Sequence, residues 1–382
     1  MKQLVMLAKS QWNPAIRREH ALAKQARANG VRVDFVEAPD DVRQLAGHNR
    51  GRWLANLWKP PRQRTQDQVN AYRRATLVPG HRSPLAASVD NRLLSRTVRA
   101  LCSGADPGET AVVVNVPWQW NAGAGLPCRR VFDAADDWNL LLNGRRPHVA
   151  RLYQQIADEA DTVIVANENL AELFPGRAVE FVPNGTQADL VADPGQRRPG
   201  LQRMVYVGTF SERFDVDLVS SVLTLLPDWT LDLFGECRYA GHGNQPAPEF
   251  AQLLDGFGPR VSWHGVLQRP ELGAVLNNAS VALVPHRARF CRGQSSMKFL
   301  DYAARGCPVV STRWEAEIDR QAPPGVWFAD TPRTFAEAVH LADAIDPGTA
   351  GSAISWARAQ TWEQRWPLWA GAVFGASATA NN

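Results

Sequence analysis

Short apolar segments alternate with amphipathic segments along most of the chain. The run QLVMLA (3–8) predicts a buried strand, and the stretch from Pro14 to Asn29 predicts a helix that stops before Gly30. VRVDFVEAP (31–39) predicts a second strand. A strand, a helix and a strand in this order predict a parallel pair joined by a helical crossover.

The alternation forms two series. Further short apolar strands of the first series are predicted at 111–116, 129–135, 161–167 and 179–185. A polar, Pro- and Gly-rich stretch at 192–200 predicts a linker. The second series starts near residue 203 and closes with a Trp-rich helical segment at 352–374. The sequence therefore predicts an α/β protein with two consecutive doubly wound, Rossmann-like sheets, whose ligands bind at the carboxyl ends of the strands.

These series define the expected domains. We expect a first domain over residues 1–190, a second over 200–350, and C-terminal helices over 351–376 that pack back on the first domain. Two such domains place the ligand in the cleft between them. No G-x-G-x-x-G follows the first strand and no P-loop pattern occurs, which disfavours a dinucleotide dehydrogenase and a P-loop NTPase.

Composition agrees with a globular protein of two domains. The chain has 382 residues, 45% of them hydrophobic and 21% charged. Five cysteines without a CxxC pair favour a reducing compartment and disfavour a disulfide framework or a zinc site. The start of the chain turns polar too soon for a signal peptide, and no apolar run approaches the length of a membrane span. We expect a cytoplasmic protein.

The net charge of +4 is unevenly distributed. Between Arg43 and Arg99 there are 12 basic residues, with Asp67 and Asp90 as the acids. Such a segment is either a solvated surface or a surface for an anionic partner, namely a phosphate, an anionic lipid or a nucleic acid. No nucleic-acid-binding module accompanies it, so no nucleic acid is expected as a partner.

Two tryptophans lie within this basic segment. Trp53 and Trp58 alternate with basic residues in GRWLANLWKPPRQR (51–64). The pattern suits peripheral contact with an anionic membrane, at the inner face, and a lipid-linked acceptor. It equally suits a lid over a soluble acceptor.

The segment SSMKFLDYAARGCPVVST (295–312) combines a helix start with a cation and an acid. It resembles a central motif of GT-B glycosyltransferases, and VYVGTFSERFDVDLV (205–219) and WHGVLQRPELGAVLNNASVALVPHR (263–287) agree with the nucleotide-binding half of that fold. The closest likeness is to retaining family-four enzymes of the teichuronic-acid type. The resemblance covers nearly the whole chain except the basic segment, and its matches in the first domain are looser.

The resemblance implies transfer of a sugar from a nucleoside-diphosphate sugar to an acceptor. It implies two Rossmann-like domains facing across a cleft, retention of configuration, and no cofactor or metal ion. The acceptor would be a glycan, a lipid-linked molecule or a natural product. A nucleotide-sugar 2-epimerase of the same fold and a non-catalytic nucleotide-sugar binding protein stay as alternatives.

The resemblance also implies a donor site around the second-domain motif. Ser295, Ser296 and Met297 would offer free N–H groups to a diphosphate, and Lys298 would add a positive charge. Asp301, where the family usually has Glu, would accept hydrogen bonds from the ribose. The alternative is a hydroxyl cap followed by an exposed Lys298–Asp301 pair.

Further donor contacts are expected at the ends of neighbouring strands. Gly208 and Thr209 would let the backbone approach the phosphates, and Arg213 would reach the diphosphate or pair with a nearby acid. Backbone groups of Val266 and Leu267 would meet the base. The remaining candidate is His264, as a contact or as a structural residue.

In the first domain, two acids follow an apolar strand. Asp136 is the candidate for chemistry, as a holder of a sugar hydroxyl or a base toward the acceptor, where the family commonly has His. Asp137 is expected to support it, and one of the two acids is expected to cap the next helix. The other acceptor-binding candidates are Asn13, Arg18, His20 and Trp138. A lone histidine on a helix is more often packed or exposed than functional.

One position departs from the family pattern. Family-four enzymes often carry a second glutamate eight residues before the first, and here that position is Gly293. Arg287, Arg289 and Arg292 precede it instead. Such a loop suits a departing diphosphate or an acidic sugar.

Overall fold

The structure of the chain is a computed structural model. It describes residues 1–12, 17–40, 62–66, 68–73, 76, 80–142, 144, 146–193, 195, 200–291, 296–314 and 322–375. The chain divides into two compact units. The first comprises Met1–Asn184, Gly293–Ser295 and Arg365–Asn382, and the second comprises Gly185–Arg292 and Ser296–Gln364.

The first unit is built on an eight-stranded sheet of order β3-β4-β2-β1-β5-β6-β7-β8. All neighbouring strands pair in parallel except β3 and β4, which form an antiparallel hairpin at one edge. The strands are β1 (Gln3–Leu7), β2 (Arg32–Val36), β3 (Arg62–Gln66), β4 (Val69–Arg73), β5 (Thr110–Val114), β6 (Arg129–Ala134), β7 (Thr162–Val165) and β8 (Glu180–Phe181).

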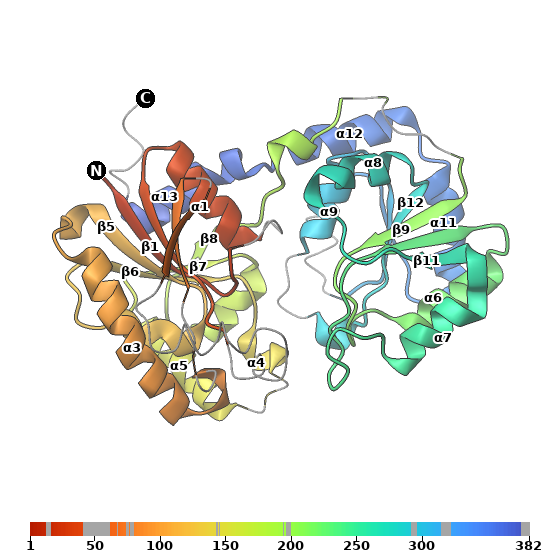
Figure 1. The fold of residues 1–382 in the computed structure, drawn as a ribbon. Helices are drawn as coiled ribbons and strands as arrows, with labels where there is room; N and C mark the ends of the chain where they lie inside the picture. The colour runs from red at the N-terminus through yellow and green to blue at the C-terminus, as the bar shows by residue number, and fades with distance from the viewer. Residues whose placement is uncertain are drawn as a thin grey trace. The chain divides into compact units, whose positions relative to one another are not determined.

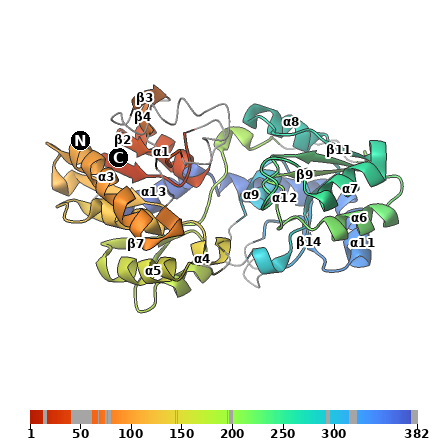
Figure 2. The same ribbon diagram turned by 60° about the horizontal axis from the view of Figure 1, so that its bottom comes forward.

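Helices cover both faces of this sheet (Figures 1 and 2). They are α1 (Arg18–Ala28), α3 (Pro84–Cys102), α4 (Trp138–Leu141), α5 (Pro147–Glu159) and α13 (Trp362–Phe374). Side chains alternate along β6, so Phe132 packs with Tyr153 of α5, whereas Asp133 bonds to Arg18 of α1 and Trp369 of α13. Therefore α3 and α5 lie on one face, and α1 and α13 lie on the other.

The second unit is built on a six-stranded parallel sheet of order β11-β10-β9-β12-β13-β14. Its strands are β9 (Arg203–Val207), β10 (Thr230–Phe234), β11 (Val261–Trp263), β12 (Val281–Val284), β13 (Val309–Ser311) and β14 (Val326–Phe328). Its helices are α6 (Val216–Leu225), α7 (Pro248–Phe257), α8 (Leu272–Asn277), α9 (Met297–Ala303), α11 (Pro332–Asp343) and α12 (Pro347–Arg358).

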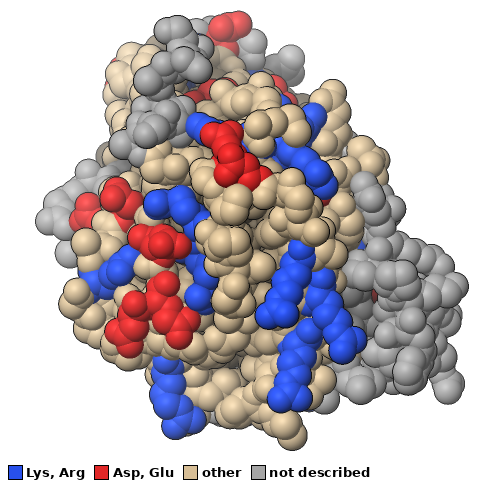
Figure 3. All heavy atoms as spheres, turned by 90° about the vertical axis from the view of Figure 1, so that its left-hand side faces the viewer, with Lys and Arg blue, Asp and Glu red and all other residues tan. Residues whose placement is uncertain are grey.

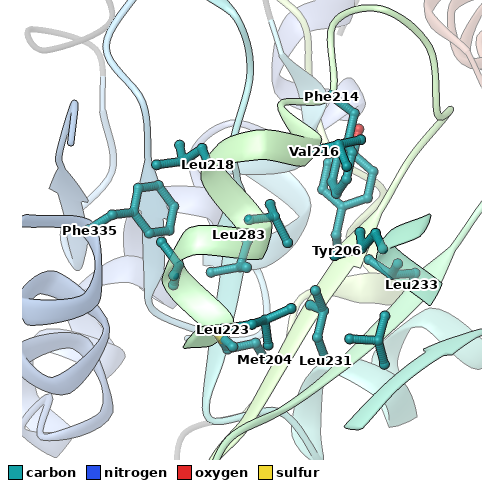
Figure 4. Close-up of a cluster of buried hydrophobic side chains, with 14 of the residues drawn as sticks. Met204, Tyr206, Phe214, Val216, Leu218, Leu223, Leu231, Leu233, Leu283 and Phe335 are labelled. Carbon is teal, nitrogen blue, oxygen red and sulfur yellow. The ribbon is translucent and has the colours of Figure 1, made fainter. Parts of the chain in front are cut away.

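Two apolar clusters hold the helices of the second unit on its sheet. One joins α6, α7 and α11 to one face, and Figure 4 shows Leu218 and Leu223 of α6 lying against Leu283 and Phe335. The other joins α8, α9 and α12 to the opposite face. Burial of continuous apolar strands on both faces explains why the sequence shows unbroken apolar runs.

The sequence predictions of two doubly wound sheets and of a returning C-terminal helix are confirmed. Within the 351–376 segment, only α13 packs in the first unit, through Trp369 and a hydrogen bond from Arg129 to the carbonyl oxygen of Val373. Helix α12 packs instead on α9 in the second unit. In the part of the chain that the structure describes, no helix has the length and apolar character to cross a membrane.

Candidate functional site

Three glycines follow the ends of adjacent strands in the second unit. Gly208, Gly235 and Gly265 come just after β9, β10 and β11. The Gly235 N–H donates to the Gly265 carbonyl at 2.6 Å, and a Cβ on Gly235 would lie 1.8 Å from the Gly208 carbonyl oxygen. Gly235 also has a φ of +144°, which disfavours any side chain there. The backbones at these strand ends are therefore packed closely.

Lys298 of α9 lies directly over Gly208. A Cβ on residue 208 would lie 2.7 Å from its Nζ atom, and Nζ lies 5.3 Å from the centre of the Tyr206 ring. No described carboxylate forms an ion pair with Lys298. Burial, and then the nearby charge of Arg213, lowers the pKa of Lys298 to about 8. Within the described part of the chain, the lysine is thus a cation without a carboxylate partner.

Arg213 and His286 lie close to this lysine. The Tyr206 hydroxyl lies 3.2 Å from His286 Nε2, and burial together with the charges of Lys298 and Arg213 lowers the pKa of His286 well below its ordinary value. The neighbouring acids have contacts of their own: Glu212 accepts from the Ala240 N–H, and Asp215 caps α6. The role of Arg213 toward a diphosphate stays a prediction. The electrostatics at this strand end favour an anion.

A pocket of about 620 Å³ opens beside this group at the ends of β12, β13 and β14. His286 forms part of its wall. Its charged lining pairs internally, with Arg287 bonding to Asp217 at 2.9 Å and lying 3.4 Å from Asp215. The remaining lining residues are Leu218, Ser221, Ala288, Arg289, Thr312, Arg313, Asp330 and Pro332. The pocket volume is within the range of sites that hold small molecules.

Asp301 is buried and already bonded within the second unit. Its carboxylate accepts from Arg269 at 2.8 and 3.1 Å and from the Thr186 hydroxyl at 2.8 Å. It does not form the exposed pair with Lys298 that the alternative reading required. Its role toward a ribose stays a prediction, and the bond to Arg269 was not predicted.

The other donor candidates differ in their surroundings. His264 stacks on Phe234, with ring centres 4.6 Å apart, and bonds to Asp232 at 2.6 Å, and its role toward a donor stays a prediction. The Thr209 carbonyl accepts from the Tyr206 hydroxyl. Val266 is exposed, and Leu267 packs against the apolar cluster that joins α8, α9 and α12 to the sheet. Ser296 precedes Met297 at the start of α9, and its side chain makes no capping hydrogen bond to the helix. Ser295 and Gly293 lie outside the described residues.

The first unit places a second polar group at the ends of β1 and β6. Lys9 bonds to Asp136 at 2.6 Å. Burial would lower the pKa of Lys9, but the charges of Asp136 and Glu19 outweigh it and raise that pKa. Glu19 accepts a hydrogen bond from the Ser10 hydroxyl at 2.5 Å. Burial would raise the pKa of Glu19, but the charge of Lys9 outweighs burial and holds that pKa below its ordinary value. Asp136 thus has a fixed countercharge.

Its neighbour Asp137 is the expected helix cap. Asp137 accepts from the N–H groups of Asn139 and Leu140 at the start of α4. Trp138 then lies edge-on against Trp118, with ring centres 4.8 Å apart.

Arg18 and His20 are buried and have structural partners. Arg18 bonds to Asp133 at 3.0 and 3.1 Å, on the α1 face of the sheet. His20 lies between Trp12 and Phe35, and its Nε2 is 3.0 Å from the Gln11 carbonyl. About 2% and 1% of the surfaces of these two residues are exposed, and the acceptor-binding role predicted for them stays a prediction. Asn13 and the 51–61 part of the Trp-containing segment lie outside the described residues.

Sequence reasoning missed Lys9, Glu19, Tyr206 and His286. Lys9 follows the predicted strand β1, and Glu19 lies in the helix after it. Tyr206 lies in the predicted strand β9. A polar residue shortly after an apolar strand was the available signal for Lys9. That signal was used for Asp136, Asp137, Thr209 and His264 but not for Lys9. Among the described residues, no three His, Cys, Asp or Glu side chains group in a way that could hold a metal ion.

Comparison with known proteins agrees with this geometry. Residues 202–342 match the family model described as "Glycosyl transferases group 1". No curated protein sequence matches the chain.

Several solved structures share the fold over essentially the full length of both chains. Sucrose-phosphate synthase from Thermosynechococcus elongatus is 15% identical with a TM-score of 0.72, and covers 100% of both chains. An E. coli structure described as trehalose-6-phosphate bound with UDP-2-fluoro glucose is 11% identical with a TM-score of 0.69, covering 98% of this chain and 99% of that one. Anabaena Alr3699/HepE in complex with UDP and glucose is 13% identical with a TM-score of 0.63, covering 99% and 98%. The expected GT-B fold is confirmed.

Proposed function

We propose that this chain, whose residues 202–342 form a glycosyl transferases group 1 domain on a GT-B fold, transfers a sugar from a nucleoside diphosphate to an acceptor. The observation that carries the proposal is Lys298, a buried cation above Gly208 that lacks a carboxylate partner among the described residues. A diphosphate at the end of β9 would supply the missing countercharge.

The same cation suits the chemistry of the leaving group. As the bond from the anomeric carbon to the diphosphate oxygen breaks, negative charge grows on the diphosphate. Lys298, with a pKa of about 8, is mostly protonated at pH 7 and stabilises that charge, and Arg213 adds to the field. The proposal therefore needs no metal ion. Retention of configuration is adopted from the family resemblance.

Asp136 is proposed to act on the acceptor. It follows β6, at the carboxyl edge of the first sheet, with the Lys9 ammonium 2.6 Å away. A carboxylate in this position can accept a hydrogen bond from an attacking hydroxyl and orient it. Lys9 would hold the carboxylate in place during the reaction.

The first experiment is calorimetric titration with UDP, GDP, dTDP and ADP, each with Mg²⁺ or with EDTA. We expect selective binding of one nucleotide, with equal affinity under both conditions. UDP is tested first, because two of the similar structures are described with UDP or a UDP-sugar. Lys298→Met should weaken binding at least 50-fold, or about 2.3 kcal/mol, whereas Lys24→Met on α1 should leave it unchanged. Absence of binding, or binding indifferent to Lys298, would overturn the donor site.

Acceptor dependence then separates transfer from the alternatives. A transferase forms a glycosylated product only when an acceptor is present. An epimerase converts the nucleotide sugar without an acceptor, and a non-catalytic binding protein leaves it unchanged. Chromatography of the nucleotide sugar with and without an acceptor mixture distinguishes the three outcomes.

A further inference from the structure

A second pocket lies in the first unit, away from the residues discussed above. It has a volume of about 470 Å³ and is lined mainly by the first halves of α3 and α5. Its lining residues are Pro84, Ala87, Ser88, Asn91, Arg92, Ser95, Asn121, His148, Arg151, Leu152 and Gln155. Neither Lys9 nor Asp136 is among them, so the pocket is not part of the group at the end of β1.

Two buried polar atoms of this lining have no hydrogen-bond partner among the residues that the structure describes. Asn91 donates from Nδ2 to the carbonyls of Ala87 and Trp118, both at 2.8 Å, which fixes its amide and leaves Oδ1 without a donor. His148 is 9% exposed, and its Nε2 is also without a partner. An unsatisfied buried polar group costs about 1–3 kcal/mol, so a ligand that supplied hydrogen bonds to both atoms would gain affinity from them.

The charge of the lining has one sign. Arg92 and Arg151 are exposed at the pocket, no acidic residue lines it, and no described carboxylate forms an ion pair with either arginine. Arg96 and Arg99 extend the exposed basic surface along α3. Figure 3 shows basic and acidic side chains mixed over the face on the left of Figure 1, together with one group of Lys and Arg side chains that has no Asp or Glu beside it.

We propose that this pocket binds a small hydroxylated anion, such as a phosphate monoester of a sugar or polyol. The anionic group would pair with Arg92 and Arg151, for which guanidinium groups are well suited. A ligand hydroxyl would donate to Asn91 Oδ1, and His148 Nε2 would bond to a second oxygen. The pocket volume is within the range of small-molecule sites. This binding is independent of the sugar transfer proposed above.

The test uses the full chain carrying Lys298→Met, so that the donor site does not contribute. Glucose 6-phosphate, inorganic phosphate and glucose are titrated by calorimetry. We expect glucose 6-phosphate to bind at least tenfold more tightly than phosphate, because phosphate lacks the hydroxyls that reach Asn91. Glucose should not bind. Phosphate binding as tightly as glucose 6-phosphate would show a plain anion site and overturn the hydroxyl contact.

Variants then locate the binding. Arg151→Gln should weaken glucose 6-phosphate binding about tenfold. The double variant that combines Arg92→Gln with Arg151→Gln should weaken it further. Arg99→Gln, on the same helix but outside the pocket, is the matched control and should bind normally. The NMR signal of the His148 ring can be assigned because it disappears in His148→Gln. The chemical shift of this signal should change when glucose 6-phosphate is added. No binding at 10 mM, or binding untouched by the double variant, would overturn the proposal.

Discussion

Lys298 occupies the space that a side chain on residue 208 would need. A Cβ on Gly208 would lie 2.5 Å from Lys298 Cε and 2.7 Å from Nζ. The two residues are 90 positions apart in sequence, and they meet because α9 returns to the end of β9, where the Tyr302 hydroxyl donates to the Val207 carbonyl and accepts from the Val207 N–H. The absence of a side chain at 208 is therefore a condition for the position of the ammonium group.

Gly208→Ala should displace the lysine without unfolding the protein. The clash is with the flexible end of Lys298, so the expected loss of stability is small, whereas nucleotide affinity should fall about tenfold, or 1.4 kcal/mol. Calorimetry and thermal unfolding measure the two effects. Gly235→Ala is the contrasting variant, because its Cβ would meet the Gly208 backbone at 1.8 Å and should destabilise the second unit strongly. Unchanged affinity in Gly208→Ala would contradict the assigned position of the lysine.

Nucleotide binding should weaken as pH rises above 8. Burial and Arg213 lower the pKa of Lys298 from 10.5 to about 8, so at pH 9 the free protein has mostly neutral lysine and binding a diphosphate takes up a proton. Titrations at pH 9 in buffers of different ionisation enthalpy measure that uptake. Lys298→Met should abolish it. Equal affinity at pH 7 and 9.5 would argue against a lysine–diphosphate contact.

The same shift affects folding. Between about pH 8 and 10.5 the unfolded chain binds more protons at this lysine than the folded chain does, so its contribution to stability rises with pH in that window. Below pH 8 the contribution of Lys298 is constant, because the lysine is charged in both states. The difference in unfolding free energy between wild type and Lys298→Met, measured across this window, tests the sign.

Asp301→Asn should affect both stability and ribose recognition. It leaves Arg269 without its countercharge, and since the pair is partly exposed we expect a loss of roughly 2 kcal/mol, less than for a fully buried pair. If Asp301 also holds the ribose, affinity for the ribonucleotide should fall severalfold, while the 2′,3′-dideoxy nucleotide should bind both proteins equally. Arg269→Gln is the control, because it disturbs the ion pair and keeps the carboxylate. Parallel losses for both nucleotides would reduce Asp301 to a structural role.

Asp136→Asn should slow transfer without weakening the donor. The change keeps the size of the side chain, removes the carboxylate and leaves Lys9 without that partner. We expect kcat to fall by 10²–10⁴-fold, the usual contribution of a general base, with nucleotide affinity unchanged. Asp137→Asn, at the helix cap, should cost about 1 kcal/mol or less of stability and little activity. Comparable kcat values for Asp136→Asn and wild type would remove Asp136 from the chemistry.

The sequence predicted most strands because buried parallel strands are unbroken apolar runs. It missed α3 and the β3–β4 hairpin, since both lie in the segment interpreted only by its charge. The signals for α3 were present: Ser83 caps it, Pro84 is its first residue, and Leu94 and Val98 face the sheet.

Pairs of charged residues were the least predictable part of the site. Arg18 and Asp133 are 115 positions apart, and Lys9 and Asp136 are 127 apart. A charged residue in a helix pattern indicates a surface position unless its partner is known, and that partner is set by strand order rather than by local sequence. Lys298 and Gly208 were found because each lies in a segment that resembles the family, namely 295–312 and 205–219.

Helix α13 has a consequence for how the chain folds during synthesis. The Trp369 indole N–H donates to Asp133, which also binds Arg18, so the polar centre of the first unit is completed by residues near the end of the chain. The second unit, by contrast, ends at Gln364. During synthesis, the full sequence of the second unit is therefore available before that of the first. Until α13 has been made, the Arg18–Asp133 pair in the N-terminal sheet lacks the hydrogen bond from Trp369.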